Sequence, residues 1–250
     1  MKDVALLLAE KVAKKRYGSR AGRASGLAEK GTLLIGGKMN TIALIGVNGK
    51  AGRFLVKEAL IKKYKVKVLV RDSKNLKYFM HYLHENVEII VGDAKSKEDI
   101  EILLKGCNAV INTVGHLKNC DGFYGNITKN IIDIMKKYEI KRYISVTSGA
   151  LQKDTDKRGF FHSLATTFMY KKYALMMSDK EEAASILEKS EINWSLYRLP
   201  KIVEESEAKE IKLNHFTMEG LKINNRNLAK FLISQIENKE HFQKMPFIWE

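Results

Sequence analysis

Three glycines spaced three residues apart form the stretch of this sequence best suited to chemistry. Gly46, Gly49 and Gly52 follow a short apolar run, Thr41–Ile45, and precede apolar residues at helical spacing. This order predicts a strand, a tight turn and a helix that starts near Ala51. Such a turn lets the backbone approach a pyrophosphate, and a helix N-terminus attracts anions. The spacing differs from the commoner G-x-G-x-x-G pattern, so the strand and helix around it carry much of the indication of a dinucleotide site.

The end of the next predicted strand bears on which dinucleotide would bind. Valines alternate with lysines over residues 65–70, and Arg71 and Asp72 follow. An acidic residue at this place normally binds the ribose 2′-hydroxyl of NAD, whereas an arginine pairs with the 2′-phosphate of NADP(H). Because Lys74 adds positive charge, we expect NADP(H) to be preferred over NAD(H), with NAD still possible. The alternative is a solvated charge pair at a strand end.

Further strands and helices alternate along the chain. Strands are predicted at Val87–Val91, Ala109–Val114, Arg142–Val146, Asn193–Leu199 and Met245–Trp249, and helices at Asn75–His84, from Ser96, at Gly122–Tyr138, from Ser178 and at Asn224–Ile236. The pattern predicts an α/β fold, a Rossmann-like doubly wound parallel sheet with helices on both faces. Ligands of such sheets bind beyond the carboxyl ends of the strands, and these strands end in small or polar residues.

The charge is unevenly distributed. The chain has 250 residues and a net charge of +15, and residues 1–38 hold nine basic against three acidic side chains. Their glycines and charges predict a flexible basic leader outside the fold. The acidic residues of this segment argue against an organellar presequence. Met39 stands just before the first strand and could be the natural start. Residues 39–250 are expected to form one domain, with a small substrate-side region at about 151–180 and 200–250.

Several other classes of function find little support. No basic–aromatic stacking motif occurs, so no nucleic acid is expected, and the apolar run Val4–Ala9 is too short to span a membrane. His81 and His84 lack a third ligand, and Cys107 and Cys120 lack metal spacing, so no metal is expected. We expect a cytoplasmic monomer or homodimer whose partner is a small-molecule acceptor.

Four segments carry a resemblance to a known family: VLVRDSKNL (68–76), VGDAKSKEDIEILLKGCNAVINTVG (91–115), NITKNIIDIMKKYEIKRYISVTSGA (126–150) and LEKSEINWSLYRLP (187–200). In order and spacing they resemble the atypical short-chain dehydrogenases/reductases, and within them the NAD(P)H-binding, NmrA-like group that includes biliverdin reductase B/flavin reductase. The resemblance extends from about Met39 to the C-terminus, so it is more specific than the glycine turn alone.

This resemblance implies a set of cofactor-binding residues. Gly46, Asn48, Gly49, Lys50 and Ala51 would cradle the pyrophosphate, with Gly52 giving the helix room. Arg71 would take the 2′-phosphate, and Asp93 and Ala94 would flank the adenine. Thr113, Val114 and Gly115 would line the path to the nicotinamide, with Thr147 and Ser148 beside it.

The catalytic pair that is usual in the superfamily is missing. Ordinary members carry Tyr-x-x-x-Lys on a helix, where the lysine lowers the tyrosine pKa. The single match, Tyr197 and Lys201, contains Pro200 at the end of a β-rich run, and we interpret it as chance. Tyr170 and Tyr173 fall in predicted helix, but neither has a lysine four residues later.

Ser148 and Lys180 are the candidate catalytic residues instead. Ser148 ends the fifth strand, where an acceptor would lie, although a turn hydroxyl bonded to its own backbone is the alternative. Lys180 belongs to Ser178–Glu182, which has the composition of a capped helix start. The functional alternative is that the Lys180 side chain points toward the nicotinamide, since the reductases that this sequence resembles carry a polar residue near this point.

Together these features predict an NADPH-dependent oxidoreductase of the atypical short-chain dehydrogenase type that reduces a small planar acceptor such as a flavin or a quinone. Aromatic and Met residues between 160 and 177 are either core or a lid over that acceptor. A redox sensor that binds NADP(H) without turnover is the main alternative. A nucleotide-sugar epimerase-like enzyme is opposed by the missing tyrosine and the short C-terminal region.

Overall fold

Apolar runs from across the sequence pair as strands of one twisted sheet. The computed structural model describes residues 40–71, 84–115, 122–157, 159–204 and 209–250, and the statements below concern these. The eight strands lie in the order β3-β2-β1-β4-β5-β6-β10-β8. They span Thr41–Ile45 (β1), Lys65–Val70 (β2), Val87–Val91 (β3), Ala109–Asn112 (β4), Arg142–Ser148 (β5), Asn193–Leu199 (β6), Lys212–Asn214 (β8) and Phe247–Trp249 (β10). All pairs are parallel except β10 with β8.

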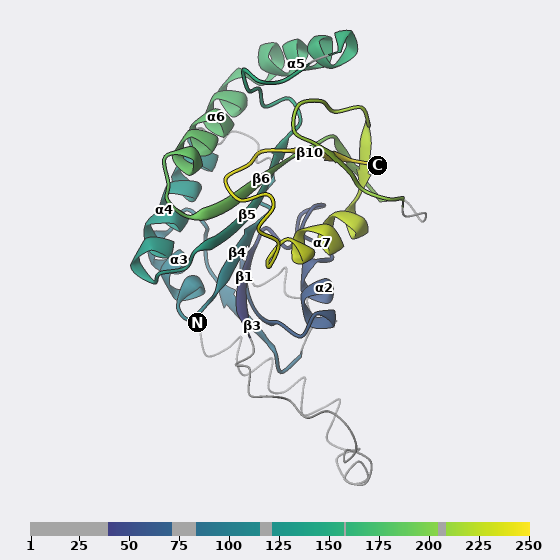
Figure 1. Ribbon diagram of the computed structural model, residues 1–250. Coiled ribbons are helices and arrows are strands. Elements are labelled where there is room, and N and C mark those ends of the chain that lie inside the picture. Colours follow the sequence, from purple (N-terminus) through teal and green to yellow (C-terminus); the bar gives the residue numbers. More distant parts are fainter. Residues whose placement is uncertain (1–39, 72–83, 116–121, 158, 205–208) are drawn as a thin grey trace. The chain divides into compact units, whose positions relative to one another are not determined.

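Helices cover both faces of this sheet (Figure 1). One face carries α3, α4 and α6, and the other carries α2 and α7. The helices span Leu55–Ile61 (α2), Lys97–Leu104 (α3), Phe123–Lys137 (α4), Phe160–Lys172 (α5), Ala174–Glu188 (α6) and Asn225–Ser234 (α7). The predicted Rossmann-like α/β fold is therefore confirmed, with a buried apolar cluster on each side of the sheet.

The direction of strand order reverses beside β1. From β1 the chain first adds β2 and β3 on one side, then β4, β5 and β6 on the other. Crossover helices leave β1 and β4 toward opposite faces, so a crevice opens at their carboxyl ends, where open α/β sheets bind ligands. The fold thus selects one edge of the sheet as the place to look for a site.

A small second sheet extends this edge. It pairs β7, Lys201–Val203, in parallel with β9, Lys222–Asn224. Because only Pro200 separates β6 from β7, the chain leaves the main sheet at its carboxyl edge and continues directly into the second one. Residues of the C-terminal third are thereby brought next to the ends of β5 and β6.

Strand bounds agree closely with the sequence prediction, whereas two helix starts were wrong. The strands at Thr41–Ile45, Val87–Val91 and Asn193–Leu199 have the predicted limits. The helix expected from Ala51 begins at Leu55, because residues before it form successive turns. The helix expected to start at Ser178 begins at Ala174. Most of the helix predicted at 75–84 lies outside the described residues, as does the leader.

A buried arginine ties the C-terminal elements to the sheet. Arg198 on β6 is fully buried, and its Nη1 lies 2.7 Å from Oδ2 of Asp156, whose side chain is also buried. Its Nε donates to the carbonyl of Met245 at 2.8 Å and its Nη2 to that of His215 at 3.2 Å. One guanidinium therefore joins β6 to the segments that precede β10 and follow β8.

Candidate functional site

The glycine turn packs directly against the end of β4. Gly46 has a φ of +84°, and a Cβ there would lie 2.6 Å from the backbone of Thr113 and Val114. A Cβ on Gly52 would lie 2.3 Å from the carbonyl oxygen of Gly46. Larger residues are excluded at both positions, so the turn stays close to the sheet. Gly52 therefore makes room for the turn itself.

Hydrogen bonds hold the neighbouring strand end in place. Thr113 donates from Oγ1 to the carbonyl of Ile45 at 3.1 Å, which links the ends of β4 and β1. Asn112 accepts from the N–H of Val114 at 3.1 Å and donates to the hydroxyl of Tyr143 at 3.0 Å. The backbone that leaves β4 is thus fixed beside the turn.

A cavity of about 780 Å³ opens where these segments meet the end of β5. Such a volume is ordinary for a small-molecule site. Nine of the predicted site residues line it: Gly49, Lys50, Ala51, Thr113, Val114, Gly115, Thr147, Ser148 and Lys180. They come from the glycine turn, the ends of β4 and β5, and α6, so the fold gathers into one place residues that are far apart in sequence.

The other predicted residues lie elsewhere. Gly46, Asn48 and Gly52 belong to the turn but do not line the cavity, and Arg71 is exposed at the end of β2. Asp93 accepts from the N–H of Lys95 and follows β3, while Ala94 is buried in a core cluster. Their assignment to the 2′-phosphate and the adenine stays a prediction.

The cavity is lined by positive but not by negative side chains. Lys50, Lys180 and Lys201 line it, and no Asp or Glu of the described residues does. None of the three lysines is ion-paired with a carboxylate in the part of the chain that the structure describes. Burial lowers the pKa of Lys180 to about 8, an effect that the negative charge of Asp179 partly opposes. The site therefore attracts anions.

Lys180 lies on α6 and faces the first turn of α4. Its Nζ is 5.2 Å from the ring centroid of Tyr124, which also lines the cavity. A cation over an aromatic face is stabilised by the ring quadrupole. Lys180 thus reaches the cavity, and its orientation toward the nicotinamide stays a prediction.

The other interpretation, that Ser178 and Asp179 start their own helix, was wrong. Asp179 is buried and accepts from the N–H groups of Tyr124 and Gly125 at 2.7 and 2.8 Å. It therefore caps α4, whose N-cap residue Gly122 has no side chain to do so. The same turn of α6 thus anchors α4 through Asp179 and places Lys180 in the cavity.

Ser148 forms the turn contact considered for it and also lies in the cavity lining. Its Oγ accepts a hydrogen bond from the N–H of Ala150 at 3.2 Å, as a turn hydroxyl does, and the residue lines the cavity. Among the described residues no acceptor receives its own O–H. The hydroxyl can therefore donate to a ligand without giving up the turn.

Sequence reasoning missed Lys201, which it considered only as the partner of Tyr197. The two are indeed unrelated, because Tyr197 is fully buried and donates to Oε1 of Gln235 at 3.0 Å, while Lys201 lines the cavity. Desolvation raises the pKa of Tyr197 to about 12. The missed signal was a charged residue two positions after the last residue of β6.

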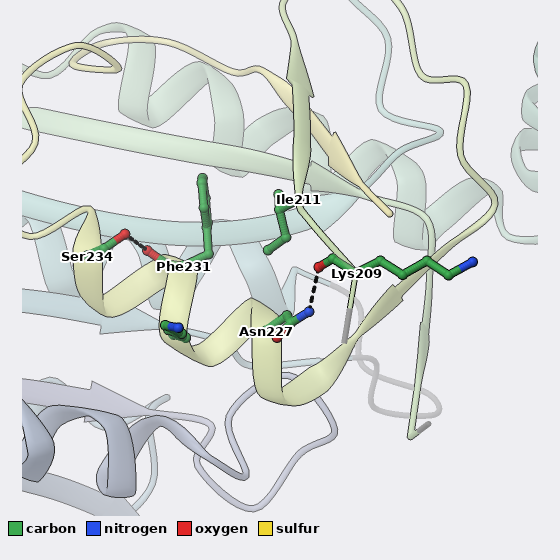
Figure 2. A pocket seen from close by; sticks show the side chains of 6 residues that line it. Lys209, Ile211, Asn227, Phe231 and Ser234 are labelled. Carbon is green, nitrogen blue, oxygen red and sulfur yellow. Dashed lines mark hydrogen bonds between the residues drawn. The ribbon is translucent and has the colours of Figure 1, made fainter. Parts of the chain in front are cut away.

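A second hollow, of about 270 Å³, lies along α7 (Figure 2). Its lining includes Asn227, which donates to the carbonyl of Lys209 at 2.8 Å, and Ser234, which donates to that of Phe231 at 2.7 Å. None of the predicted site residues lies there. The larger cavity is therefore the candidate site.

A protein-family comparison decides the family. The model of the family described as NAD(P)H-binding matches residues 46–239, which include the glycine turn and the ends of β4, β5 and β6. The chain belongs to the NAD(P)H-binding family. The turn residues and the lysines in the cavity lining fit a cofactor with a pyrophosphate group.

Solved structures share the fold of this NAD(P)H-binding protein. A short-chain dehydrogenase/reductase (wide type) from Veillonella parvula, solved in complex with NADP, has a TM-score of 0.70 at 14% identity and covers 85% of this chain and 95% of its own. The anaerobilin reductase ChuY from Escherichia coli O157:H7 has a TM-score of 0.67 at 16% identity, over 84% and 97%.

A curated relative matches over a shorter stretch. The photosystem II assembly factor Ycf39 of Trieres chinensis is 36% identical over 73 residues, which are 29% of this chain and 22% of that protein. The match thus spans under a quarter of that relative's length, so the similarity concerns one segment of each protein.

Three further findings concern metal ions, membrane spans and the thiol of Cys107. Within the described ranges, no cluster of three or more His, Cys, Asp or Glu could hold a metal ion. No helix in the same ranges is long and apolar enough to cross a membrane. Cys107 is buried, and desolvation raises the pKa of its thiol to about 12, which makes it a poor nucleophile.

Proposed function

We propose that this protein is an NADPH-dependent oxidoreductase of the atypical short-chain dehydrogenase type that reduces a small planar acceptor. One observation carries the proposal: the glycine turn, the ends of β4 and β5, and three lysines line the same cavity. The family supplies NAD(P)H binding, and the anaerobilin reductase with the same fold supports reduction as the chemistry. The preference for NADPH and the acceptor class are our inferences.

The residues of the turn would hold the cofactor. Gly49 and Ala51 would place their backbone against the pyrophosphate, and the ammonium of Lys50 would offset its charge. Thr113 to Gly115 would line the path toward the nicotinamide. Arg71 would bind the 2′-phosphate at the exposed end of β2, and Asp93 and Ala94 the adenine side.

The cofactor, when bound, supplies a hydride, so the protein's own task is to position the acceptor and exclude water. Val146, Leu199 and Ile202 give the cavity apolar walls on the sheet side, and Met169 and Met218 add flexible ones. The O–H of Ser148 would orient the acceptor. The ammonium of Lys180 would stabilise negative charge that develops on it.

NADPH consumption against a panel of flavins, quinones and linear tetrapyrroles tests this function. We expect turnover with at least one planar acceptor, and loss of cofactor binding in Gly46→Val, because the added side chain would clash with Thr113 and Val114. Gly106→Ala is the matched control: Gly106 also has a positive φ, but a Cβ there meets nothing within 4 Å. Cofactor binding that survives Gly46→Val in a folded protein would contradict the proposed site.

A redox sensor is the second candidate, because Tyr197 and Lys201 do not form the usual catalytic pair and Tyr197 lies outside the cavity. The same observation opposes an epimerase-like enzyme. Tight NADPH binding without turnover of any acceptor would favour the sensor.

A further inference from the structure

We propose that the end of the domain around α5 docks on an anionic lipid membrane. Three large apolar side chains are exposed there: Leu164 and Phe168 on α5 and Leu175 at the start of α6, with exposed fractions of 61%, 59% and 68%. Soluble proteins seldom keep such side chains together in water unless they serve an interaction. Figure 1 shows α5 at the margin of the domain, beyond α6, where a large partner can reach it.

One side of α5 faces the domain and the other faces solvent. Thr166 is buried and lines the cavity together with Met169. Leu164 and Phe168 stand four residues apart, so they share a face of the helix, and exposed Lys171 follows Leu164 by two helical turns on that same side. An amphipathic helix that combines Leu and Phe with lysines is the kind that lies in the plane of a membrane interface.

A loop of the C-terminal third extends this surface. Phe216 is 47% exposed and lies beside the start of α5, because its carbonyl accepts from the N–H of Lys157 at 2.9 Å. Leu221 is 85% exposed and lines the cavity together with Thr166 and Met169 of α5. Five of the eight large apolar side chains that are exposed in the described residues therefore belong to α5, to the residue just after it or to this loop.

The charge of the surface indicates which partner it fits. Residues 159–175 contain no Asp or Glu, and Lys171 and Lys172 are exposed among the apolar side chains. The Lys172 ammonium lies 5.5 Å from the ring centroid of Phe168. Neither lysine has a carboxylate within 4.0 Å in the part of the chain that the structure describes. Both ammonium groups are therefore available to anionic headgroups while the apolar side chains enter the interface.

A second copy of the chain fits this surface less well. A two-fold contact through α5 would bring Lys171 and Lys172 of both copies together, and like charges across an interface oppose association. Leu164 and Leu221 protrude from different segments around the cavity. A protein partner would need a shaped pocket for each of them, whereas a fluid lipid interface accommodates both.

Vesicle binding tests the proposal. The full chain is mixed with vesicles of phosphatidylcholine alone or of phosphatidylcholine with phosphatidylglycerol, and co-sedimentation measures binding. We expect binding to the anionic vesicles to be about tenfold or more tighter, and to weaken as salt is raised. Phe168→Trp adds a second readout, because Trp194 and Trp249 are both buried. Its fluorescence should shift to shorter wavelength with anionic vesicles only.

Variants assign the binding to α5. Phe168→Ser, and Lys171→Gln combined with Lys172→Gln, should each weaken binding to anionic vesicles about tenfold. Both changes are made at exposed positions, so the fold should be kept, and thermal unfolding verifies this. Residues 1–38 are the same in every variant, so any attraction that they have for anionic lipids is common to all.

Matched controls come from α2, which lies on the opposite face of the sheet from α6. Ile61→Ser removes an apolar side chain that is 60% exposed. Lys57→Gln combined with Lys62→Gln removes the same charge from exposed positions in α2 and just after it. Neither control should change binding to anionic vesicles by more than about twofold, since exposed charges beyond a Debye length from the lipid are largely screened.

Each outcome decides for or against the proposal. Absence of binding to anionic vesicles overturns it. Binding that the α5 variants leave unchanged also overturns it, because another basic part of the chain is then responsible. A concentration-dependent dimer that Phe168→Ser abolishes, in a protein that ignores vesicles, would assign the surface to a second copy. NADPH binding and turnover are measured without lipid, so the proposed function is judged separately.

Discussion

The carboxylate of Asp179 on α6 accepts a hydrogen bond from the backbone N–H of Gly125 on α4, at 2.8 Å. Its second oxygen accepts from Tyr124 at 2.7 Å, so a residue 54 positions later in the chain caps the helix. Glu182 lies one turn further along α6 and approaches so closely that a Cβ on Gly125 would be 2.7 Å from its carboxylate. The two helices are thereby held in one arrangement beneath the cavity.

Asp179→Ala should destabilise the protein by about 2–3 kcal/mol, because two N–H groups of a buried helix start lose their acceptor. Ser178→Ala is the control. Ser178 is exposed in the middle of α6, and its loss should change stability by less than about 0.5 kcal/mol. Urea unfolding of the three proteins measures both effects. If Ser178→Ala were the more damaging change, the capping contact would be misassigned.

Asp156→Ala should cost about 3–5 kcal/mol, since it leaves the buried guanidinium of Arg198 without its carboxylate. Asp154→Ala removes the same group from an exposed position two residues earlier and should have little effect. Thermal or urea unfolding distinguishes them. If both variants lost only a little free energy of unfolding, the carbonyl oxygens around Arg198 would be sufficient to stabilise its buried charge.

Arg71→Ala should remove most of the expected preference for NADPH over NADH, because a charge-assisted phosphate contact is worth about 1.5–3 kcal/mol. Lys65→Ala is a matched control, exposed at the opposite end of β2. Both cofactors are titrated against the three proteins. A wild-type protein that binds NADH as well as NADPH would refute the assignment of Arg71.

Ser148→Ala should lower acceptor turnover by a factor of about ten or more while leaving NADPH affinity nearly unchanged, because one donor to the acceptor is lost. Ser145→Ala serves as the comparison. Ser145 lies on the same strand and donates to the carbonyl of Asn112 at 2.9 Å, away from the cavity lining. Its loss should reduce stability more than turnover. Undiminished turnover in Ser148→Ala would remove Ser148 from the site.

Stability should depend on pH through Lys180, whose pKa falls from 10.5 to about 8 on folding. Below pH 8 the folded protein bears the cost of a desolvated ammonium, and between pH 8 and 10.5 the unfolded chain binds more protons, so stability rises with pH there. Lys180→Met lacks this contribution. The free energy of unfolding of wild type should therefore rise relative to that of the variant between pH 7.5 and pH 10. Urea unfolding of both proteins at these two pH values measures the change. A constant difference would show that Lys180 is solvated.

Sequence patterns were sufficient for β1 to β6 because strand signals are local, whereas the three-residue strands β7, β8 and β9 were not predicted. The apolar run Thr41–Ile45 is bounded by Asn40 and Gly46, and β1 has those limits. Helix starts depend more on distant contacts. Ser178 and Asp179 have the composition of a cap, but nothing nearby indicates that Asp179 serves α4 instead.

The cavity residues at the ends of the strands could be predicted from the sequence, but the complete lining could not. Ser148 and Thr113 follow the rule that ligands bind at the carboxyl ends of strands. Lys201 obeys the same rule, yet its place in a chance Tyr-x-x-x-Lys match obscured it. Thr166 on α5 is buried at the cavity, with no hydrogen-bond partner for its hydroxyl among the described residues, and no sequence signal distinguished it.

The partners of Arg198 also set an order for assembly during synthesis. Asp156 leaves the ribosome before Arg198, whereas His215 and Met245 leave after it. Strands β1 to β5 are complete long before β10 joins β6. Because a buried charge is destabilising until it is paired, the segments that Arg198 joins to β6 should become rigid last. A nascent chain would thus complete strands β1 to β5 before its C-terminal segments are fixed against β6.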